Sequence, residues 1–361
     1  MVCNILTKKN EKLINRQIKI GQSISHLKKI YLDTNYWIRI TDCKTSADKA
    51  LLNLLEKLVE AGKVILPISE VTFWEILKQT DINSLKRSAQ VIDKLSKGIS
   101  IINEKERQKL EFIHFVKQRT NSQIYDINKA VWTTLSLNLL NPFFIEKNPE
   151  MINESFLDFV ETMSFEKIIT FLESTSNLKP FHFKDNIDKL NYAKEKYNWQ
   201  NKNFNEMFLT ELGGYLEIFE NNFNQYFEEI YFLETGKIVS EEEKKNIDSK
   251  LWKTMIYNLT KHNKLKNELP SYRIYPLMNA EIRWNKTRKY KDGNDTMDFL
   301  HVTASLPYFD FFFTEKELRS IINKHKLNEK YKCLVLSNIN DVLETLEKNV
   351  TNTTPSPMAR I

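Results

Sequence analysis

Glycine and cysteine are scarce in this sequence of 361 residues, and each scarcity excludes a class of protein. Seven glycines are too few for a β-rich fold or for an architecture built on glycine-rich loops. The three cysteines, Cys3, Cys43 and Cys333, have no CxxC spacing, so they predict neither a disulfide framework nor a thiolate zinc site. We therefore expect a mostly helical protein in a reducing, cytoplasmic compartment.

Long hydrophobic runs are also missing. The N-terminal stretch "MVCNILTKKNEKLINRQIKIGQ" has no apolar segment of the kind that a secretory signal requires. No apolar run approaches the ~18–20 residues of a transmembrane helix. Membrane association is therefore not expected.

The charge of the chain is only mildly basic. It has 53 Lys and Arg against 47 Asp and Glu, a net charge of +6, which permits a nucleic-acid partner without requiring one. Hydrophobic residues make up 41% of the chain, enough for the core of one large domain or two ordinary ones.

Short apolar runs alternate with amphipathic helical patterns at both ends of the chain, whereas the middle shows only long helical patterns. The runs at 30–32, 64–66, 311–313 and in "YKCLVLS" predict strands. This alternation predicts an α/β fold, a parallel sheet flanked by helices and interrupted by a large all-helical insertion. The expected division is an N-terminal basic arm (1–27), the first part of the α/β domain (28–103), the insertion (104–285), the second part of the domain (286–348) and a flexible tail (349–361).

Acidic residues occur next to these predicted strands. Asp33 follows the first strand, Glu75 lies on the helix after the second, Asp298 lies on the helix before "DFFFT", and Asp310 opens that strand. If the strands are parallel neighbours, acids from separate segments converge where α/β folds bind ligands. The alternative for Asp33 is that it only caps the helix through "TNYWIRI".

Such a cluster of carboxylates predicts a metal site. Carboxylates within ~4 Å of each other repel strongly unless their pKa values rise or a hard cation neutralises them. Oxygen-only ligands suit Mg²⁺ or Mn²⁺. A divalent ion on such a rim activates water and stabilises the charge that develops at phosphorus, which is the chemistry of phosphodiester hydrolysis.

Four segments, in order, resemble the motifs of the PIN-domain nuclease family. They are "IYLDTNYWIRI", "LPISEVTFWEILK", "NDTMDFLHVTASLPYFDFFFTEKEL" and "YKCLVLSNINDVLETL", which lie within residues 28–100 and 290–348. The resemblance implies metal-dependent cleavage of RNA, less often of DNA. It also implies that Asp33, Glu75 and Asp298 are metal ligands, with Asp310 as a further ligand or supporting carboxylate.

One departure from the family pattern is the Thr314-Glu315 pair, where many PIN domains have an aspartate after the threonine. Asn35, Asp295, Thr314 and Glu315 are candidates for supporting contacts, although Asp295 reads equally well as a helix cap. His301 either orients the Asp298 carboxylate or packs in the core.

A basic run with aromatic residues, "RWNKTRKYK", precedes the third motif. Arg283, Arg288 and Lys289 are the predicted nucleic-acid contacts, against the alternative of a solvated helix end. Trp37 and Trp74 stand beside the motifs, and we expect both in the core.

Three functions remain to be weighed. The first is an endoribonuclease in which the insertion selects the RNA or a partner, with an inhibitory protein and a homo-oligomer as further expectations. The alternative is a non-catalytic PIN-fold scaffold that binds RNA or protein. A structure-specific DNA nuclease ranks third, because the insertion shows no DNA-anchoring signature.

Overall fold

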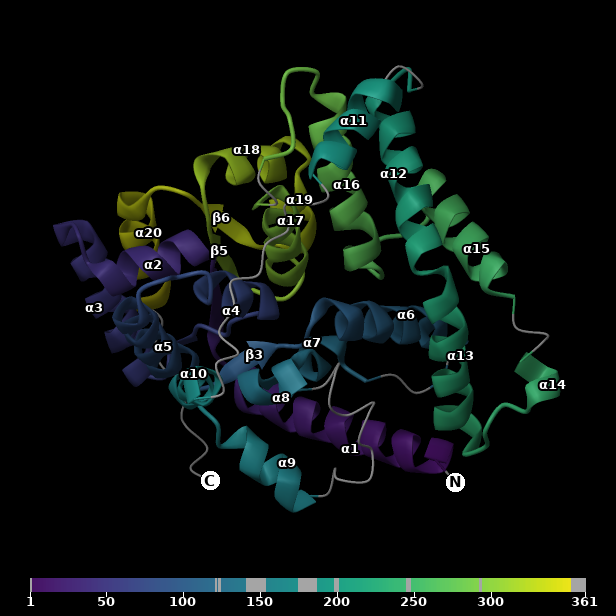
Figure 1. The fold of residues 1–361 in the computed structure, drawn as a ribbon, viewed down its shortest axis with the longest axis horizontal. Coiled ribbons are helices and arrows are strands. Elements are labelled where there is room, and N and C mark those ends of the chain that lie inside the picture. Colours follow the sequence, from purple (N-terminus) through teal and green to yellow (C-terminus); the bar gives the residue numbers. More distant parts are fainter. Residues whose placement is uncertain are drawn as a thin grey trace.

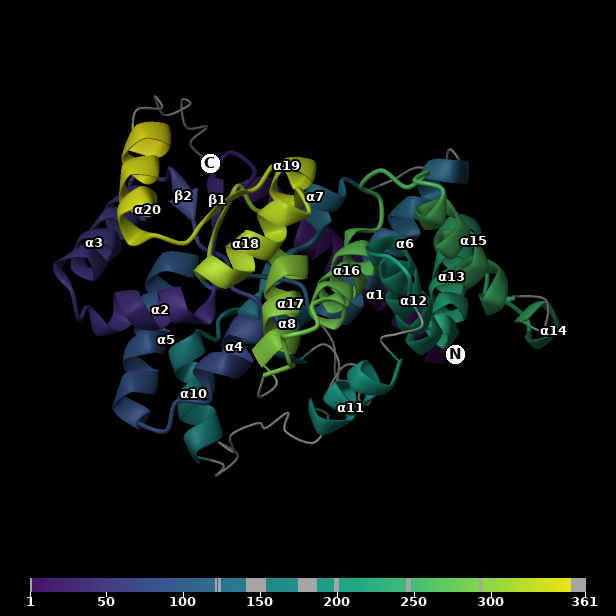
Figure 2. The same cartoon turned by 90° about the horizontal axis from the view of Figure 1, so that it is seen from above.

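The computed structural model describes residues 2–120, 122, 125–140, 154–174, 187–197, 201–244, 248–291 and 294–351, without the side chains of 2–11, 140 and 351. Helices dominate these residues, and Figures 1 and 2 show their arrangement around a small sheet. The first helices are α1 (Val2–Ser23), α2 (Thr34–Asp42), α3 (Ser46–Glu60), α4 (Glu70–Ile76), α5 (Ile82–Ser96), α6 (Glu104–Thr120), α7 (Ile127–Ala130), α8 (Leu135–Leu140), α9 (Glu154–Glu161) and α10 (Phe165–Ser174). The remaining ones are α11 (Ile187–Tyr197), α12 (Phe204–Ile218), α13 (Glu220–Thr235), α14 (Glu241–Lys244), α15 (Ser249–Lys261), α16 (Pro270–Trp284), α17 (Asn294–Ser305), α18 (Lys316–Lys324), α19 (Leu327–Tyr331), α20 (Ile339–Leu346) and a π-helical turn, Glu347–Thr351.

The sheet has four parallel strands in the order β2-β1-β5-β6. These strands are β1 (Lys28–Leu32), β2 (Val64–Ile65), β5 (Phe311–Phe313) and β6 (Leu334–Leu336). Apart from the lysines that begin β1, aromatic and aliphatic residues form these strands, and all of them but the exposed Leu334 are buried, as in other parallel sheets that are covered by helices. The predicted parallel sheet flanked by helices is confirmed.

Alternate residues of each strand enter two different hydrophobic clusters. Ile30, Leu32 and Phe313 pack with α2, α3, α5 and α20, which lie to the left of the sheet in Figure 1. Tyr31 and Phe312 face the other way and pack with residues of α6, α16 and α17. This period of two places one helical layer on each face of the sheet.

The helical middle of the chain shares its core with the sheet. Phe112 of α6, Phe223 of α13 and Tyr272 of α16 belong to the same cluster as Tyr31 and Phe312. Figures 1 and 2 show α11 to α16 on the right of the molecule, joined to the sheet side through α6, α16 and α17. Helices α12 and α16 pack extensively on each other, as do α16 and α17.

The expectation that residues 104–285 are all helical is wrong at one place. Strand β4 (Trp132–Thr134) lies within this range and pairs antiparallel with β3 (Ile99–Ile101), with Ile99 opposite Thr134. Both strands are only three residues long, and the long helix α6 separates them in the chain. Because the two strands lie far apart in the chain, the local sequence pattern of each gives little indication that they pair.

Both ends of the described chain pack against the rest of the protein. The basic arm forms helix α1, which packs on α7 and β4. A Cβ atom at Gly21 would lie 2.1 Å from the carbonyl oxygen of Lys129, so the close approach of α1 to α7 requires glycine there. The tail predicted as flexible from residue 349 is wrong for its first residues, because Val350 is buried and its carbonyl accepts a hydrogen bond from Lys63. Residues 352–361 lie outside the described part.

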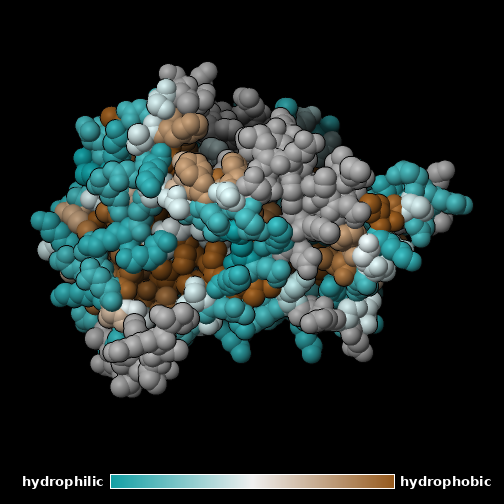
Figure 3. Space-filling model, turned by 90° about the horizontal axis from the view of Figure 1, so that it is seen from below, coloured by the Kyte–Doolittle hydropathy of each residue, from teal (hydrophilic) through white to brown (hydrophobic). Residues whose placement is uncertain are grey.

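No helix among the described residues is long and apolar enough to cross a membrane. Figure 3 shows the face seen from below, on which hydrophilic residues predominate and hydrophobic residues form patches between them.

Candidate active site

Asp33 lies where β1 ends and α2 begins. Its carboxylate Oδ1 accepts a hydrogen bond from the amide of Tyr36 at 3.1 Å, so Asp33 caps α2. The same side chain lines a cavity, so the capping role and the site role are both present in one residue. Burial raises the pKa of the Asp33 carboxyl to about 6, with the charge of Glu315 adding to the shift and His301 opposing it.

Glu75 reaches the same cavity from α4. Ser69 caps this helix, and Glu75 lies six residues further along, near the C-terminal end of the helix. The Glu75 carboxylate accepts hydrogen bonds from the hydroxyl of Thr34 and from Nε2 of His301, the latter at 2.9 Å. Burial opposes the ionisation of Glu75, but these contacts outweigh it and hold the pKa of this carboxyl below its usual value. Glu75 is therefore an ionised group in the wall of the cavity.

Asp298 comes from α17, the third segment of the site. Burial raises the pKa of this carboxyl to about 7, and the negative charges of Glu75 and Asp33 add to the shift. The positive charge of His301 opposes this shift without cancelling it. Asp298 thus lies in the wall of an acidic cavity, where His301 offsets part of its negative charge.

These three acids share one cavity of about 230 Å³. It lies at the carboxyl ends of β1 and β5, where a parallel sheet presents its ligand-binding edge. Its lining holds four carboxylates and two groups that can carry positive charge, so it has an excess of negative charge when all are ionised. The lining residues are Asp33, Thr34, Asn35, Glu75, Lys78, Asn294, Asp298, His301 and Glu315.

Buried hydrogen bonds join His301, in the cavity wall, to Tyr31 and Ser69. Nδ1 of His301 lies 2.6 Å from the hydroxyl of Tyr31, which in turn lies 2.6 Å from the hydroxyl of Ser69. Burial alone would lower the pKa of His301, but Tyr31 and Glu75 outweigh burial and hold that pKa well above its usual value. The sequence offered His301 either as a partner of Asp298 or as a packed core residue; it is buried and contacts Glu75 instead. The sequence missed Tyr31, because Tyr31 reads as an ordinary buried strand residue.

Asp310 is not part of this cluster, so its prediction as a metal ligand is wrong. It precedes β5, and its carboxylate is bound to Nζ of Lys28 at 2.7 Å and to the amide of Lys29 at 2.9 Å, at the start of β1. Residues that precede parallel strands lie at the opposite edge from residues that follow them. Asp310 and Asp33 therefore lie at opposite ends of the neighbouring strands β5 and β1.

Thr314 and Glu315 follow β5 and lie on the cavity side instead. Thr314 is buried, and its amide donates to the carbonyl oxygen of Leu336. Glu315 lines the cavity, and its carboxylate accepts a hydrogen bond from the side-chain amide of Asn35. The supporting positions predicted for Asn35 and Glu315 agree with this arrangement.

The predicted basic contacts are engaged elsewhere. Arg288 is bound to Asp295 at 2.7 Å and to Glu317 at 3.3 Å, and Arg283 is bound to Glu211. Asp295 is buried and also accepts a hydrogen bond from the amide of Lys291, so it holds the loop before α17 and does not line the cavity. Arg283 and Arg288, predicted as phosphate contacts, are thus held in ion pairs within the protein, and Asp295, predicted as a supporting residue, pairs with Arg288 outside the cavity lining.

Lys289 has a looser arrangement. It is largely exposed and lies 3.6 Å from Glu195. Such a surface pair contributes at most about 1 kcal/mol. Lys289 is thus the member of the predicted basic group that still presents its charge to solvent.

The cavity offers carboxylate oxygens, the type of ligand that a hard cation prefers. They are not arranged as a complete set of metal ligands. Across the described residues, no group of three or more His, Cys, Asp and Glu side chains is arranged to hold a metal ion. The donors available are the carboxylates of Asp33, Asp298 and Glu75, and the raised pKa of Asp298 shows that burial and its acidic neighbours outweigh the positive charge of His301. This donor type is the one that Mg²⁺ and Mn²⁺ prefer.

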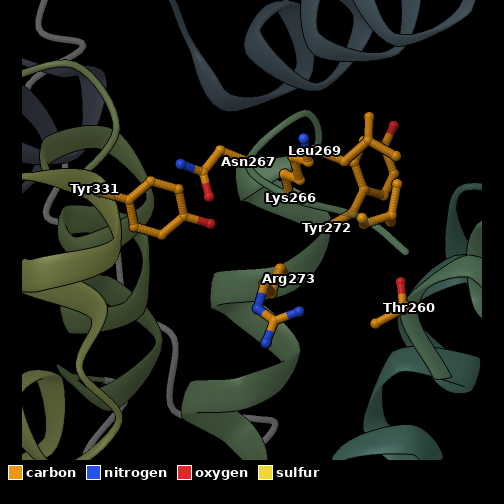
Figure 4. A pocket seen from close by; sticks show the side chains of 8 residues that line it. Thr260, Lys266, Asn267, Leu269, Tyr272, Arg273 and Tyr331 are labelled. Carbon is orange, nitrogen blue, oxygen red and sulfur yellow. The ribbon is translucent and has the colours of Figure 1, made fainter. Parts of the chain in front are cut away.

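A second cavity, between α15, α16 and α19, is too small to compete as a binding site. Figure 4 shows Arg273 and Tyr331 among the side chains that line it. Its volume of about 10 Å³ leaves room for about one water molecule. The buried Nε of Arg273 and hydroxyl of Tyr331, which have no protein partner, are groups that such a water would satisfy.

Comparison of the chain with protein-family models, with curated proteins and with solved structures gives no match in any of the three.

Proposed function

We propose that this protein is a metal-dependent phosphodiesterase, an endoribonuclease with a PIN-like α/β domain. The observation that carries the proposal is the convergence of Asp33, Glu75 and Asp298, from three separate segments, on one open cavity at the carboxyl ends of β1 and β5. A wall of like charges is unfavourable in a stable fold unless a cation uses it.

The three carboxylates have different tasks in this proposal. Asp33 and Asp298, whose pKa values are raised, would lose their protons as they bind Mg²⁺ or Mn²⁺, and Glu75 is already ionised. The bound cation would lower the pKa of a water molecule and stabilise the charge that develops on the phosphate. Binding would draw the three carboxylates together, because like charges at short range are tolerated only around a cation.

Neighbouring side chains orient Glu75 among these carboxylates. The imidazole of His301 and the hydroxyl of Thr34 hold one oxygen of Glu75, and Tyr31 holds the opposite nitrogen of the ring. The other Glu75 oxygen, Oε1, lies 3.8 Å from Nζ of Lys78. Glu75 can therefore accept a cation without giving up its contact with His301.

Incubation with RNA tests this proposal. Wild type, Asp33→Asn and Asp298→Asn are each incubated with total RNA and with single-stranded DNA, in Mn²⁺, Mg²⁺ or EDTA. Metal-dependent cleavage of RNA that both substitutions abolish supports the endoribonuclease. Cleavage of DNA alone would favour the DNA nuclease, and cleavage that persists in EDTA would contradict a metal-dependent enzyme.

One observation favours a second candidate, the non-catalytic scaffold. Glu75 already has an internal cationic partner in His301, so part of the charge in the cavity is balanced by the protein itself. In that case RNA or a protein would bind to the large helical part, and neither substitution would change the binding.

A further inference from the structure

The lining of the acidic cavity holds hydrogen-bond donors as well as carboxylates. Its residues with a donor in the side chain are Thr34, Asn35, Lys78, Asn294 and His301. Three of these donate to the carboxylates of Glu75 and Glu315. Lys78 has a looser contact, because its ammonium nitrogen lies 3.8 Å from Oε1 of Glu75, beyond the about 2.7–3.2 Å of a hydrogen bond. Asn294 is exposed at the first residue of α17. Lys78 and Asn294 are thus the donors of the lining that are best placed to bind a ligand.

These two donors come from the ends of two helices that also hold carboxylates in the cavity. Lys78 follows the end of α4 by two residues, Asn294 begins α17, and the two helices pack on each other (Figures 1 and 2). The C-terminal end of α4 is open to solvent, because the Lys78 side chain is 33% exposed and Trp74 is 40% exposed. The sequence placed Trp74 in the core, which is wrong, whereas Trp37 is buried as expected. A ligand from solvent can therefore reach Lys78 and the carboxylates of the same cavity.

A phosphodiester matches this arrangement of charges. Its phosphate is an anion, which the carboxylates alone would repel. With a cation on the carboxylates, the phosphate is attracted through one oxygen, and another oxygen needs a donor in the same cavity. A lysine ammonium is a common phosphate ligand, because it is a compact positive charge that carries several donors. Lys78 can leave Glu75 at little cost, since an ion pair of this length and exposure contributes little to stability.

We propose that Lys78 and Asn294 form a phosphate subsite beside the carboxylates, in which the ammonium group of Lys78 and the side-chain amide of Asn294 bind non-bridging oxygens of the phosphodiester. The inference rests on the proposed function and adds the residues that hold the substrate. Lys78 thereby takes the role that the sequence assigned to Arg283 and Arg288, which are held in ion pairs. The subsite contacts only the backbone of the nucleic acid, so it binds RNA of any base sequence.

The melting temperature of the protein with a mononucleotide tests this subsite separately from cleavage. The probe is uridine 5′-monophosphate in saturating Mg²⁺, compared with uridine, which lacks the phosphate. We expect the monophosphate to raise the melting temperature of wild type beyond its value in Mg²⁺ alone, and uridine to leave it unchanged. We expect Lys78→Gln to weaken binding of the monophosphate about tenfold, the lower end of the range for a hydrogen bond to a charged group, because Lys78 is partly exposed. Asn294→Ala removes an uncharged donor and is expected to weaken binding about two- to tenfold.

Matched variants separate the subsite from a general effect of charge or of structure. Lys86→Gln is the control, because Lys86 is 38% exposed, lies 2.9 Å from Glu173 and does not line the cavity, so binding is expected to stay as in wild type. Lys78→Arg keeps the positive charge and is expected to retain most of the binding. Lys78→Gln is also expected to keep the response to Mg²⁺, because it removes a positive charge beside Glu75. A residue that only supported the fold of the site would weaken both responses.

The outcomes separate this inference from the proposed function. Monophosphate binding that Lys78→Gln leaves unchanged, or that Lys86→Gln weakens as much, would overturn the subsite, and so would equal stabilisation by uridine. Wild type that cleaves RNA but is not stabilised by the monophosphate would overturn the subsite and leave the nuclease standing. Stabilisation that depends on Lys78 without any cleavage of RNA would support the subsite and contradict the nuclease. If Lys78→Gln unfolds, Asn294→Ala decides the outcome.

Discussion

The imidazole Nε2 of His301 lies 2.9 Å from Oε2 of Glu75, and this contact joins α17 to α4 beneath the acidic cavity. Both side chains are largely buried, and the opposite ring nitrogen of His301 is held by Tyr31. The pair explains why Glu75 has a lowered pKa in a wall where the pKa values of Asp33 and Asp298 are raised. The contact thus fixes Glu75 in its ionised state before any cation binds.

Replacement of His301 tests this contact. We expect His301→Asn to lower the free energy of unfolding by about 1–3 kcal/mol, because a buried carboxylate loses its charged partner. Glu75 stabilises the fold above its ordinary pKa of 4.5, and His301 stabilises it below its ordinary pKa of 6.5. The loss measured by urea unfolding is therefore greatest between these values. It shrinks as the pH falls through the lowered pKa of Glu75 and as the pH rises through the raised pKa of His301. Tyr31→Phe, the control, keeps the pair and loses less stability. A loss that is independent of pH would contradict the pair.

Replacement of Asp298 has the opposite effect on stability. Its folded-state pKa of about 7 lies above the ordinary value of 3.8, so the folded protein keeps a proton that the unfolded chain releases, and stability falls as the pH rises through this window. In EDTA above about pH 7 we therefore expect Asp298→Asn to be more stable than wild type by about 1–2 kcal/mol. Asp295→Asn, three positions away, is the control and loses stability because it weakens the ion pair with Arg288. Equal losses in both variants would show that Asp298 has a structural partner.

Substitutions of Asp33 and Asp310 test which end of the parallel strands carries the metal site. We expect Asp33→Asn to abolish Mn²⁺-dependent cleavage of RNA without unfolding the protein, because asparagine caps a helix as well as aspartate does. Asp310→Asn weakens only contacts with Lys28 and Lys29, so cleavage persists. Both are measured on the same RNA, with melting curves alongside. Loss of activity in both variants at unchanged stability would show that Asp310 acts at the metal site together with Asp33, as the sequence predicted.

Arg288 and Lys289 form a matched pair for the basic run. We expect Arg288→Gln to lower the free energy of unfolding by about 3–5 kcal/mol, because it leaves the buried carboxylate of Asp295 unpaired. Lys289→Gln changes stability by no more than about 0.5 kcal/mol, since Lys289 is largely exposed. Urea unfolding measures both. A stable Arg288→Gln protein with weakened RNA binding would restore the original assignment of Arg288.

The sequence predicts most of the sheet, because short runs rich in β-branched and aromatic residues, such as "IYL" and "FFF", favour buried strands between helices. It also predicts Asp33, Glu75 and Asp298, since each lies in a motif whose local structure is readable. The error at Asp310 has a simple cause: it precedes its strand, whereas Asp33 follows its own, and parallel strands separate such residues. The pairing of β3 with β4, the exposure of Trp74 and the contact of Tyr31 with His301 depend on segments distant in the chain, which local patterns do not reveal.

The most direct test of the central claim, that this cavity binds a divalent cation, is the melting temperature of the protein in rising concentrations of Mn²⁺. The expected result for wild type is a progressive increase, equivalent to about 2.7 kcal/mol when Mn²⁺ reaches a hundred times its Kd. Asp33→Asn and Asp298→Asn are expected to lose this increase, while Asp310→Asn keeps it. A wild-type melting temperature that neither Mn²⁺ nor Mg²⁺ changes, or an increase that survives in both cavity variants, would contradict the claim.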